Sequence, residues 1–351
     1  MASRRSRIVL RLFFALALLL VTGCGRRDVS SKGEYVWVSA PEATLRDRVA
    51  TIYNKAGIVH NGERVEVLER MPKKAFVRVR SPRGEEGWVQ ERFLADRRTY
   101  DLVQKLADKV RNAPVQASAL CRSQANLHAT PGRKTEHLYS LAENQKVDLL
   151  ERQIADRNGL TLKESPTDSS SSDEPATPAD KPAPTPVPED WWLVRDSQKR
   201  AGWVLGRLLY VEVPIEIAQY AEGQRTTAIF KLDEAEDRGK KFSEYLVLLT
   251  ENKDGLSYDF DQVRVFTWNS RAHRYETAFS QHHVSGVLPV VMGREAFGDE
   301  GPLPTFTWHV KDDDSTLHEQ KFKFKSPRVQ RVLAPGEGPP ATPHRRQHGA
   351  K

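Results

Sequence analysis

The chain has 351 residues, a formal net charge of +7 and two cysteines, Cys24 and Cys121. Residues 1–23 hold four arginines and no acid, so removal of that segment would leave a nearly balanced chain of +3. The nominal pI of about 9.3 is therefore no argument for a nucleic-acid partner. If Cys24 carries a lipid, a disulfide within the processed chain is also excluded, because Cys121 has no other cysteine to pair with.

Residues 1–23 have the pattern of a secretory signal peptide. Arginines precede an apolar run over residues 12–21, which is about half of the ~20 residues that span a bilayer. The run ends in Val21-Thr22-Gly23-Cys24, which resembles the bacterial lipobox. The resemblance implies cleavage before Cys24, a diacylglycerol group on its thiol and fatty acids such as palmitate in the anchor. Gly25 rather than aspartate follows, so we expect a periplasm-facing lipoprotein at the outer rather than the inner membrane; an uncleaved anchor is the alternative.

Residues 34–95 are predicted to form a first small β domain. Apolar and charged residues alternate over residues 65–70 and 76–80, which is the pattern of half-buried strands. Ser81-Pro82-Arg83-Gly84 is predicted to be a turn, and Gly87-Trp88-Val89 begins another short strand. Short strands separated by turn residues indicate a small antiparallel barrel.

Residues 96–114 are predicted to form a linker helix after this domain. Asp96 or Asp101 can cap its start through a carboxylate oxygen. Apolar residues recur at the three- and four-residue spacing of one helix face, namely Leu102, Val103, Leu106 and Val110. The charged residues between them are expected to form a solvated face.

Residues 117–212 are predicted to repeat the first β domain. Residues 147–152 resemble residues 65–70 at an offset of 82, and Gly202-Trp203-Val204 repeats Gly87-Trp88-Val89 at an offset of 115. The 33-residue difference predicts an insertion in the second copy, at about 157–190. Its richness in serine, proline and acids predicts a disordered loop between two strands.

The order of these segments resembles the bacterial SH3 domain, a small β-barrel common in envelope proteins. In the first copy, the matching segments are Ala43-Thr44-Leu45-Arg46 and residues 62–68, 76–80 and 87–89. In the second copy, they are Ala125-Asn126-Leu127-His128 and residues 191–195 and 202–204. His128 stands where arginine is usual and Glu143-Asn144 replaces the glycine turn, so a shared ligand does not follow. The resemblance implies a bacterial lipoprotein with two SH3-like barrels joined by a helix.

Residues 213–333 are predicted to form a third, all-β domain that resembles no family we recognise. A sandwich or a partial barrel is expected from six strand-like segments: residues 226–230, 245–249, 263–268, 287–291, 305–310 and 321–324. Residues 252–255 and 312–314 are predicted turns, and residues 266–269 with 274–276 a hairpin. The proline-rich, basic tail over residues 334–351 is expected to be disordered.

No metal site or cofactor is predicted. His282 and His283 are adjacent, which does not place both imidazoles on one face of a strand, and no third ligand is evident. The run of aspartates at residues 312–314 lacks the ordered spacing of a calcium loop. Cys121 is predicted to be a small buried hydrophobe; as a catalytic thiol it would need a histidine base.

The sequence favours a non-enzymatic envelope lipoprotein that binds a cell-wall peptide or a protein partner through its paired barrels. Tyr53 and Tyr139 precede the core strand of each copy and are the candidate binding residues. Trp88 and Trp203 are expected in the cores. Two alternatives stay open: a cell-wall hydrolase or other enzyme with its activity in the C-terminal domain, and an assembly or scaffold lipoprotein. No catalytic residue is assigned.

Overall fold

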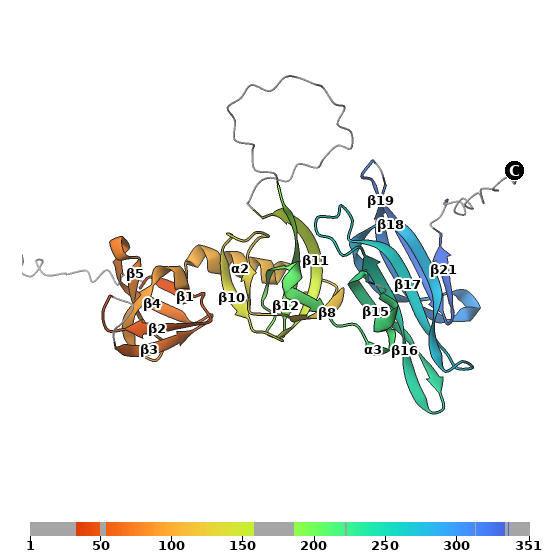
Figure 1. Cartoon of the computed structure of the whole chain (residues 1–351), viewed down its shortest axis with the longest axis horizontal. Helices are drawn as coiled ribbons and strands as arrows, with labels where there is room; N and C mark the ends of the chain where they lie inside the picture. The colour runs from red at the N-terminus through yellow and green to blue at the C-terminus, as the bar shows by residue number, and fades with distance from the viewer. Residues whose placement is uncertain are drawn as a thin grey trace, which may run out of the picture.

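The computed structural model describes residues 33–49, 54–157, 186–221, 223–312, 314–333 and 336. Over these residues the chain forms three antiparallel sheets of seven strands each, with two α-helices, which confirms the predicted all-β class. The first, second and third sheets follow one another along the long axis of the molecule (Figure 1). Within the described parts, no helix has the length and apolar character needed to cross a membrane.

The first sheet has the strand order β3-β2-β6-β5-β4-β1-β7. Its alternating strands place Val77 and Val79 in the core, while Arg78 and Arg80 face outward and pair with glutamates. The predicted turn after Arg80 is present, with the Gly84 N–H donating to the Ser81 carbonyl. The strands are β1 (Tyr35–Val38), β2 (Glu42–Arg46), β3 (Lys55–His60), β4 (Arg64–Met71), β5 (Phe76–Arg80), β6 (Glu86–Gln90) and β7 (Leu94–Ala95).

The second sheet repeats this arrangement strand for strand, in the order β10-β9-β13-β12-β11-β8-β14. A bulge between Val67 and Glu69 in the first sheet recurs between Leu149 and Glu151, at the same offset as the sequence repeat. The strands are β8 (Ala117–Cys121), β9 (Ala125–His128), β10 (His137–Leu141), β11 (Lys146–Asp156), β12 (Pro188–Asp196), β13 (Ala201–Leu205) and β14 (Leu209–Val211).

Strand pairing around the predicted insertion extends further than the sequence indicated. β11 continues to Asp156 and β12 begins at Pro188, and these two residues are paired. The two long strands pair with each other in the same sheet, and the insertion lies between the paired Asp156 and Pro188 in the sequence (Figure 1). Residues 158–185, on which the prediction of a disordered loop falls, lie outside the described residues.

Helix α2 (Arg97–Lys109) joins the first two sheets and covers the outer face of the second. The Asp96 carboxylate caps it by accepting from the Thr99 N–H at 2.8 Å. Trp203 lies on this outer face and is 5% exposed, because it packs in a cluster with Leu106 and Val110. The equivalent Trp88 of the first sheet is only half-buried. The prediction of a core position is therefore confirmed for Trp203, which is buried between the second sheet and α2, and wrong for Trp88, which lies outside the core of the first sheet.

The third sheet is a single sheet with its strands in sequence order, which agrees with the partial barrel among the two predicted architectures and not with the sandwich. The sheet closes on itself in part, because the long β18 contacts β21 and encloses an aromatic core that includes Phe260 and Trp308. The predicted hairpin is present, with Trp268 paired to Tyr275. The strands are β15 (Arg225–Asp237), β16 (Lys240–Thr250), β17 (Phe260–Asn269), β18 (Arg274–Ala296), β19 (Pro302–Lys311), β20 (Leu317–Lys325) and β21 (Arg328–Val332).

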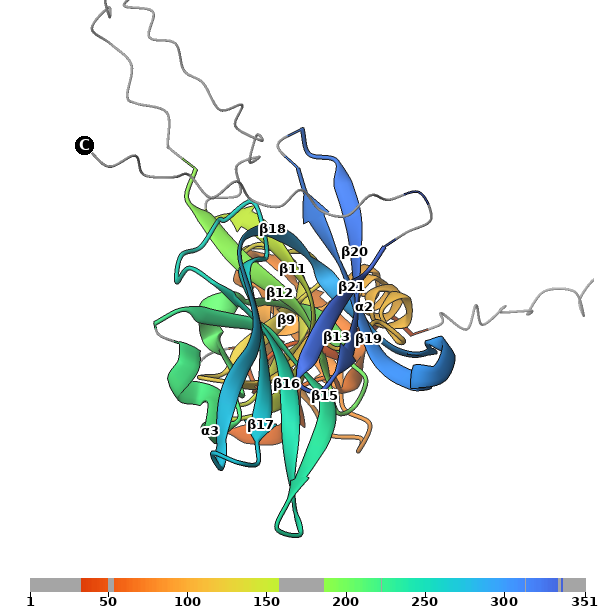
Figure 2. The ribbon, with the colours of Figure 1, turned by 90° about the vertical axis from the view of Figure 1, so that its right-hand side faces the viewer.

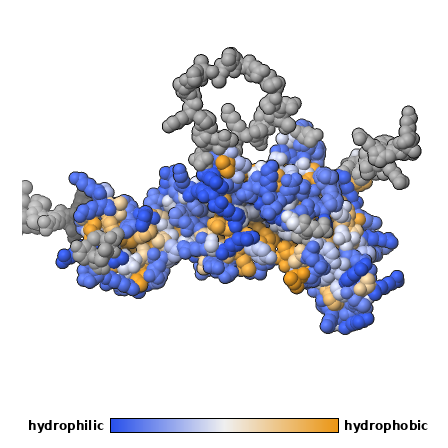
Figure 3. Space-filling model, in the orientation of Figure 1, coloured by the Kyte–Doolittle hydropathy of each residue, from blue (hydrophilic) through white to orange (hydrophobic). Residues whose placement is uncertain are grey.

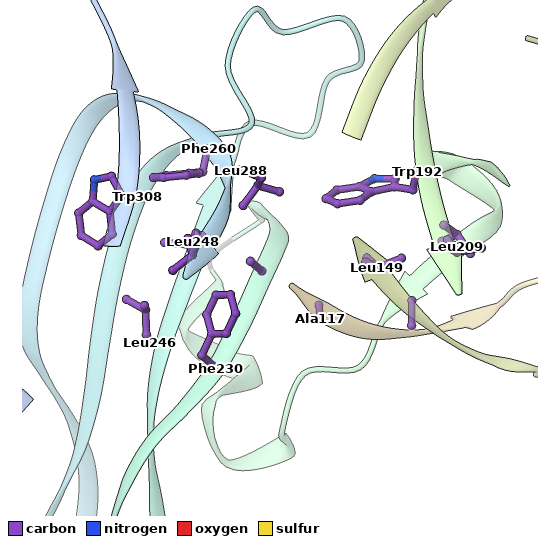
Figure 4. Packing of buried hydrophobic residues seen from close by; sticks show 14 of the residues in the cluster. Ala117, Leu149, Trp192, Leu209, Phe230, Leu246, Leu248, Phe260, Leu288 and Trp308 are labelled. Carbon is purple, nitrogen blue, oxygen red and sulfur yellow. The ribbon is translucent and has the colours of Figure 1, made fainter. Parts of the chain in front are cut away.

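The second and third sheets share one hydrophobic core. Trp192 and Leu149 of the second sheet face Leu288 and Leu248 of the third, and Ala117 lies between them (Figure 4). Figure 2 looks onto the third sheet from its far side, with the other two sheets behind it. A helix of one turn, α3 (Ile215–Ala218), connects the sheets and buries Ile217 against the outer face of the third. The two sheets are thus docked through buried apolar surface.

Candidate binding cleft between the second and third sheets

A cleft of about 520 Å³ lies where the second sheet meets the third. Its apolar lining includes Leu149, Trp192 and Leu209 from the second sheet, and its polar lining includes Arg225 and Thr226 from the third. The volume falls within the range of about 300–1,000 Å³ that is usual for ligand sites, which occur preferentially at domain interfaces. Apolar surface gathers at this junction (Figure 3), where Tyr210 and Ile215 are 53% and 88% exposed.

A buried charge network holds the two walls of the cleft together. Arg152 of β11 donates to the carboxylates of Asp190 at 2.7 Å and Asp259 at 2.9 Å, and to the Leu256 carbonyl at 3.1 Å. Burial opposes ionisation of Asp190, but the Arg152 guanidinium and the Gly255 N–H outweigh it and hold the pKa of Asp190 below its ordinary value. Burial dominates at Asp259 and raises its pKa. The network therefore joins β11 and β12 to the turn before β17.

A buried amide fixes the same interface on its other side. Gln116 is fully buried; its carbonyl oxygen accepts from the Val290 N–H at 2.7 Å and its NH₂ group donates to the Val290 carbonyl at 3.3 Å. The backbone carbonyl of Gln116 accepts from the Ile229 N–H at 2.9 Å. These bonds tie the start of β8 to β18 and β15, so the cleft has walls of fixed separation.

Three arginines line the cleft, and two of them retain capacity for a ligand. Arg225 is committed to Asp190 at 2.7 Å and Asp254 at 3.0 Å. Arg122 donates to the Leu209 carbonyl at 3.3 Å and lies over the Tyr210 ring at 5.4 Å. Within the described part of the chain, no carboxylate pairs with Arg122 or with the exposed Arg207. The cleft therefore presents two guanidinium groups that suit a carboxylate.

Two sheet edges also border the cleft. β14 is the last strand of the second sheet, and its residues Leu209 to Val211 line the cleft. β15 is the first strand of the third sheet and contributes Arg225 and Thr226. An edge strand offers backbone N–H and C=O groups to an added extended chain. The geometry is thus suited to a peptide in extended conformation.

The binding and lipidation residues that the sequence suggested lie outside the cleft or outside the described residues. Cys24 and Tyr53 lie outside the described residues. Tyr139 is half-buried between the first sheet, α2 and the second sheet, where its hydroxyl accepts from the Gln104 amide at 3.2 Å and Arg200 lies 4.9 Å from its ring centre. Much of its ring is therefore already occupied by neighbours. Its role in ligand binding stays a prediction.

The other sequence candidates have clear environments. Cys121 is fully buried in the core, as predicted, and burial raises the pKa of its thiol. Burial and the nearby His137 lower the pKa of His128 to about 4, so this imidazole is neutral at pH 7. His282 bonds with Gln262 and Ser280. Among the described residues, no three His, Cys, Asp or Glu side chains form a group that could hold a metal ion.

Sequence reasoning missed the residues of the cleft. Arg122 follows β8 in a polar turn and Arg207 lies in a short 3-10 helix after β13, and neither position carries a signal of its own in the sequence. Only the docking of the third sheet places them beside Arg225, which is 103 and 18 residues away along the chain. Exposed Tyr210, on a strand otherwise buried at Leu209, was the one local hint.

Six chains among the solved structures match this chain, and the similarity is long but weak in the two described below. The structure of NlpC1 from Trichomonas vaginalis is 9% identical, covers 86% of this chain and 91% of its own, and has a TM-score of 0.17. The structure of NlpC2 from the same organism is 11% identical, covers 82% of this chain and 96% of its own, and also has a TM-score of 0.17. At these TM-scores the similarity indicates neither a fold nor an activity.

Comparison with protein families identifies one region. No curated protein matches the chain. The family model described as bacterial SH3 domain matches residues 41–95, which include β2 to β7 of the first sheet. This region holds the segments on which the resemblance rested, among them Leu45-Arg46 and Gly87-Trp88-Val89. The chain therefore contains one bacterial SH3 domain, at residues 41–95.

Proposed function

We propose that the chain is a lipid-anchored bacterial envelope protein that binds an extended, carboxylate-bearing peptide and catalyses no reaction. The peptide would come from the cell wall or from a protein partner. The single observation that carries the binding proposal is the cleft between two sheet edges, in which two guanidinium groups have no carboxylate partner among the described residues. The bacterial SH3 domain at residues 41–95 supports a place in the envelope.

The second sheet enters this proposal as a second SH3-like barrel. Its strand order matches the first sheet, and the bulge after Leu149 repeats the bulge after Val67. In both sheets the last residue of the second strand pairs with the tryptophan of the Gly-Trp-Val segment, Arg46 with Trp88 and His128 with Trp203. Because bulges are conserved within a fold family, the shared register and the shared bulge support the same fold for both sheets.

The cleft would recognise a peptide through three kinds of contact. Arg122 and Arg207 would form charge-assisted hydrogen bonds with side-chain or terminal carboxylates. The edges of β14 and β15 would pair with the peptide backbone, which supplies affinity without selecting a sequence. Trp192 and Tyr210 would add apolar contact area, and aromatic and arginine side chains dominate the energy of such interfaces.

A binding role without catalysis agrees with the environment of the thiol. Cys121 is fully buried and its pKa is raised, so the thiolate that a cysteine hydrolase requires would be scarce and inaccessible. Cys24 would be consumed by the lipid anchor. An assembly or scaffold role differs from wall binding only in the source of the peptide, and the binding experiment separates the two.

We expect the double substitution Arg122→Ala, Arg207→Ala to lower affinity for the ligand by about 100-fold, since each charge-assisted hydrogen bond contributes ~1.5 kcal/mol or about tenfold in affinity. The measurement is retention of the chain without residues 1–24 on purified sacculi and on a protein extract of the envelope. Arg328→Ala, an exposed arginine of β21 away from the cleft, is the matched control.

Each outcome of this experiment has a meaning. Retention on sacculi that the double variant loses supports a wall peptide. Capture of the same envelope protein by the wild type and the control, but not by the double variant, supports a protein partner. Equal retention of all three proteins, or of none, would exclude the cleft as the binding site.

The anchor is tested by Cys24→Ser. We expect the wild-type protein to sediment with membranes and to be released by detergent, because acyl chains give stable anchoring. The Cys24→Ser protein is expected to accumulate unprocessed, with no incorporation of labelled palmitate, while Cys121→Ser behaves as the wild type. Processing and labelling that survive Cys24→Ser would rule out the lipid anchor.

A further inference from the structure

The interdomain cleft is the first of three adjoining hollows on the second sheet. A second hollow, of about 420 Å³, is lined by His128, Trp191 and Leu205 and shares Arg207 with the cleft. A third, of about 520 Å³, lies beside the turn after β9 and shares Arg133 with the second. Each hollow shares one lining side chain with the next, Arg207 or Arg133, and we call the three hollows together the basic groove.

The basic groove carries an excess of positive charge. Among the described residues that line it, the only carboxylates are those of Asp156 and Asp254. The Asp156 side chain is already bonded to the Val187 N–H, and Asp254 to Arg225. The lining cations are Arg122, Arg133, Lys134, Arg157, Arg207 and Arg225.

A buried carboxylate pairs with two of the arginines in the outer part of the basic groove. Glu189 is 3% exposed and accepts from Arg133 and Arg157, at 2.8 Å and 2.9 Å. The hydrogen bond from Arg133 in particular holds the pKa of Glu189 below its ordinary value, so the carboxylate stays charged and both guanidinium groups keep their places. Two arginines on one carboxylate leave a net positive charge, and the exposed Lys134 adds to it.

Between Arg207 and Arg133, which it shares with its neighbours, the middle hollow is lined by aromatic and apolar side chains and by the amides of Gln124 and Asn126. Trp191 forms its floor and His128 packs edge-on against the indole, with ring centres 5.3 Å apart. The imidazole carries no charge at pH 7, because its pKa lies at about 4. Leu205 and Leu208 complete this surface. A ligand that lies along the groove would therefore contact the arginines of the cleft, then the Trp191 surface, and then the cations around Arg133.

We propose that the ligand of the cleft is an acidic polypeptide segment of a partner protein that lies along the whole basic groove. The inference rests on the proposed function and names its ligand. A short wall peptide would fill the cleft alone and leave the outer cations unused. The two sheet edges and the apolar middle favour a polypeptide over a polysaccharide, since they offer backbone pairing and side-chain contacts. Charge complementarity then selects acidic residues on both sides of an apolar one.

Two synthetic peptides test the length of the site. One has about 4 residues and fills the cleft; the other has ~12 residues, or about 40 Å of extended chain, with glutamates flanking leucines. Fluorescence anisotropy measures the affinity of each peptide for the chain without residues 1–24. We expect the long peptide to bind about tenfold more tightly than the short one and to lose more affinity as salt is raised, because exposed charges are screened.

Single substitutions test which hollow gives the long peptide its higher affinity. Lys134→Glu, in the outermost hollow, is expected to remove the advantage of the long peptide and to leave the short peptide unaffected. Arg207→Glu, at the junction of two hollows, is expected to weaken both. Lys105→Glu is the matched control, since Lys105 is exposed on α2 and lies outside the groove.

The experiments distinguish a failure of the extended groove from a failure of the cleft as a binding site. Equal affinities for the two peptides, or a Lys134→Glu protein that still prefers the long one, would overturn the extended groove. If the short peptide still loses affinity on Arg207→Glu, the cleft survives as a binding site. Binding of neither peptide overturns the acidic segment, and retention on sacculi then decides the proposed function alone.

Discussion

Replacement of Arg152 by alanine is expected to lower the free energy of unfolding by about 3–5 kcal/mol, which is the usual cost of breaking a buried ion pair. The Arg152 side chain is 3% exposed, and its partners Asp190 and Asp259 are 0% and 11% exposed. Without the guanidinium, two carboxylates would stay in a dry interface with fewer donors than they need. The Leu256 carbonyl would also lose its donor.

Because this network joins the second sheet to the third, we expect the Arg152→Ala protein to unfold in two steps rather than one. Chemical denaturation followed by tryptophan fluorescence measures both the free energy and the number of transitions. The control is Arg157→Ala at the end of the same strand. Arg157 is 46% exposed and its partner Glu189 keeps Arg133, so a loss below about 1 kcal/mol is expected. Equal losses in the two proteins would show that the buried network does not hold the sheets together.

Gly202→Ala is expected to destabilise the second sheet by at least ~1–3 kcal/mol, the usual cost of overpacking a core. A Cβ atom at Gly202 would lie 2.6 Å from the Leu127 Cβ and 3.0 Å from its backbone, so β9 and β13 would have to separate. The first sheet has the same constraint, since a Cβ at Gly87 would lie 2.8 Å from the Leu45 Cβ. Gly87→Ala is therefore expected to destabilise by a similar amount.

Gly84→Ala serves as the control for these two substitutions. Gly84 has a φ of +87°, and an added Cβ would meet no atom within 4 Å. Its cost is then only the backbone strain of about 1–2 kcal/mol. Thermal unfolding of the three variants checks the prediction. If Gly202→Ala and Gly87→Ala differ strongly from one another, the two sheets are not built on the same close approach.

The predicted hairpin of the third sheet and the cap of α2 were within reach of sequence reasoning because their causes are local. Asp96 lies three residues before the N–H that it accepts from, and residues 269 and 274 are joined by a short turn. The alternation around Val77 and Val79 likewise reports which side of a strand is buried. The bacterial SH3 domain at residues 41–95 was predictable for the same reason, since its pattern is short and closely spaced along the chain.

The cleft was not predictable, because its causes lie far apart. Arg152 and Asp259 are 107 residues apart, and Gln116 and Val290 are 174 apart. No periodicity marks a charged residue that will be buried by another domain. The burial of Trp203 was decided in the same way, because α2 covers its side of the second sheet. Among the described residues no helix covers Trp88, which stays half-buried.

By itself, the sequence determined that this protein is all-β, that its first unit has the bacterial SH3 pattern and that a capped helix follows it. Each of these depends on neighbouring residues that share a strand face or a helix turn. Only the tertiary structure decided that the third unit is one bent sheet, and that its docking creates a basic cleft. Those outcomes depend on which sheet faces pack against each other. The free energy of that packing comes from buried contacts between residues that are far apart in the chain.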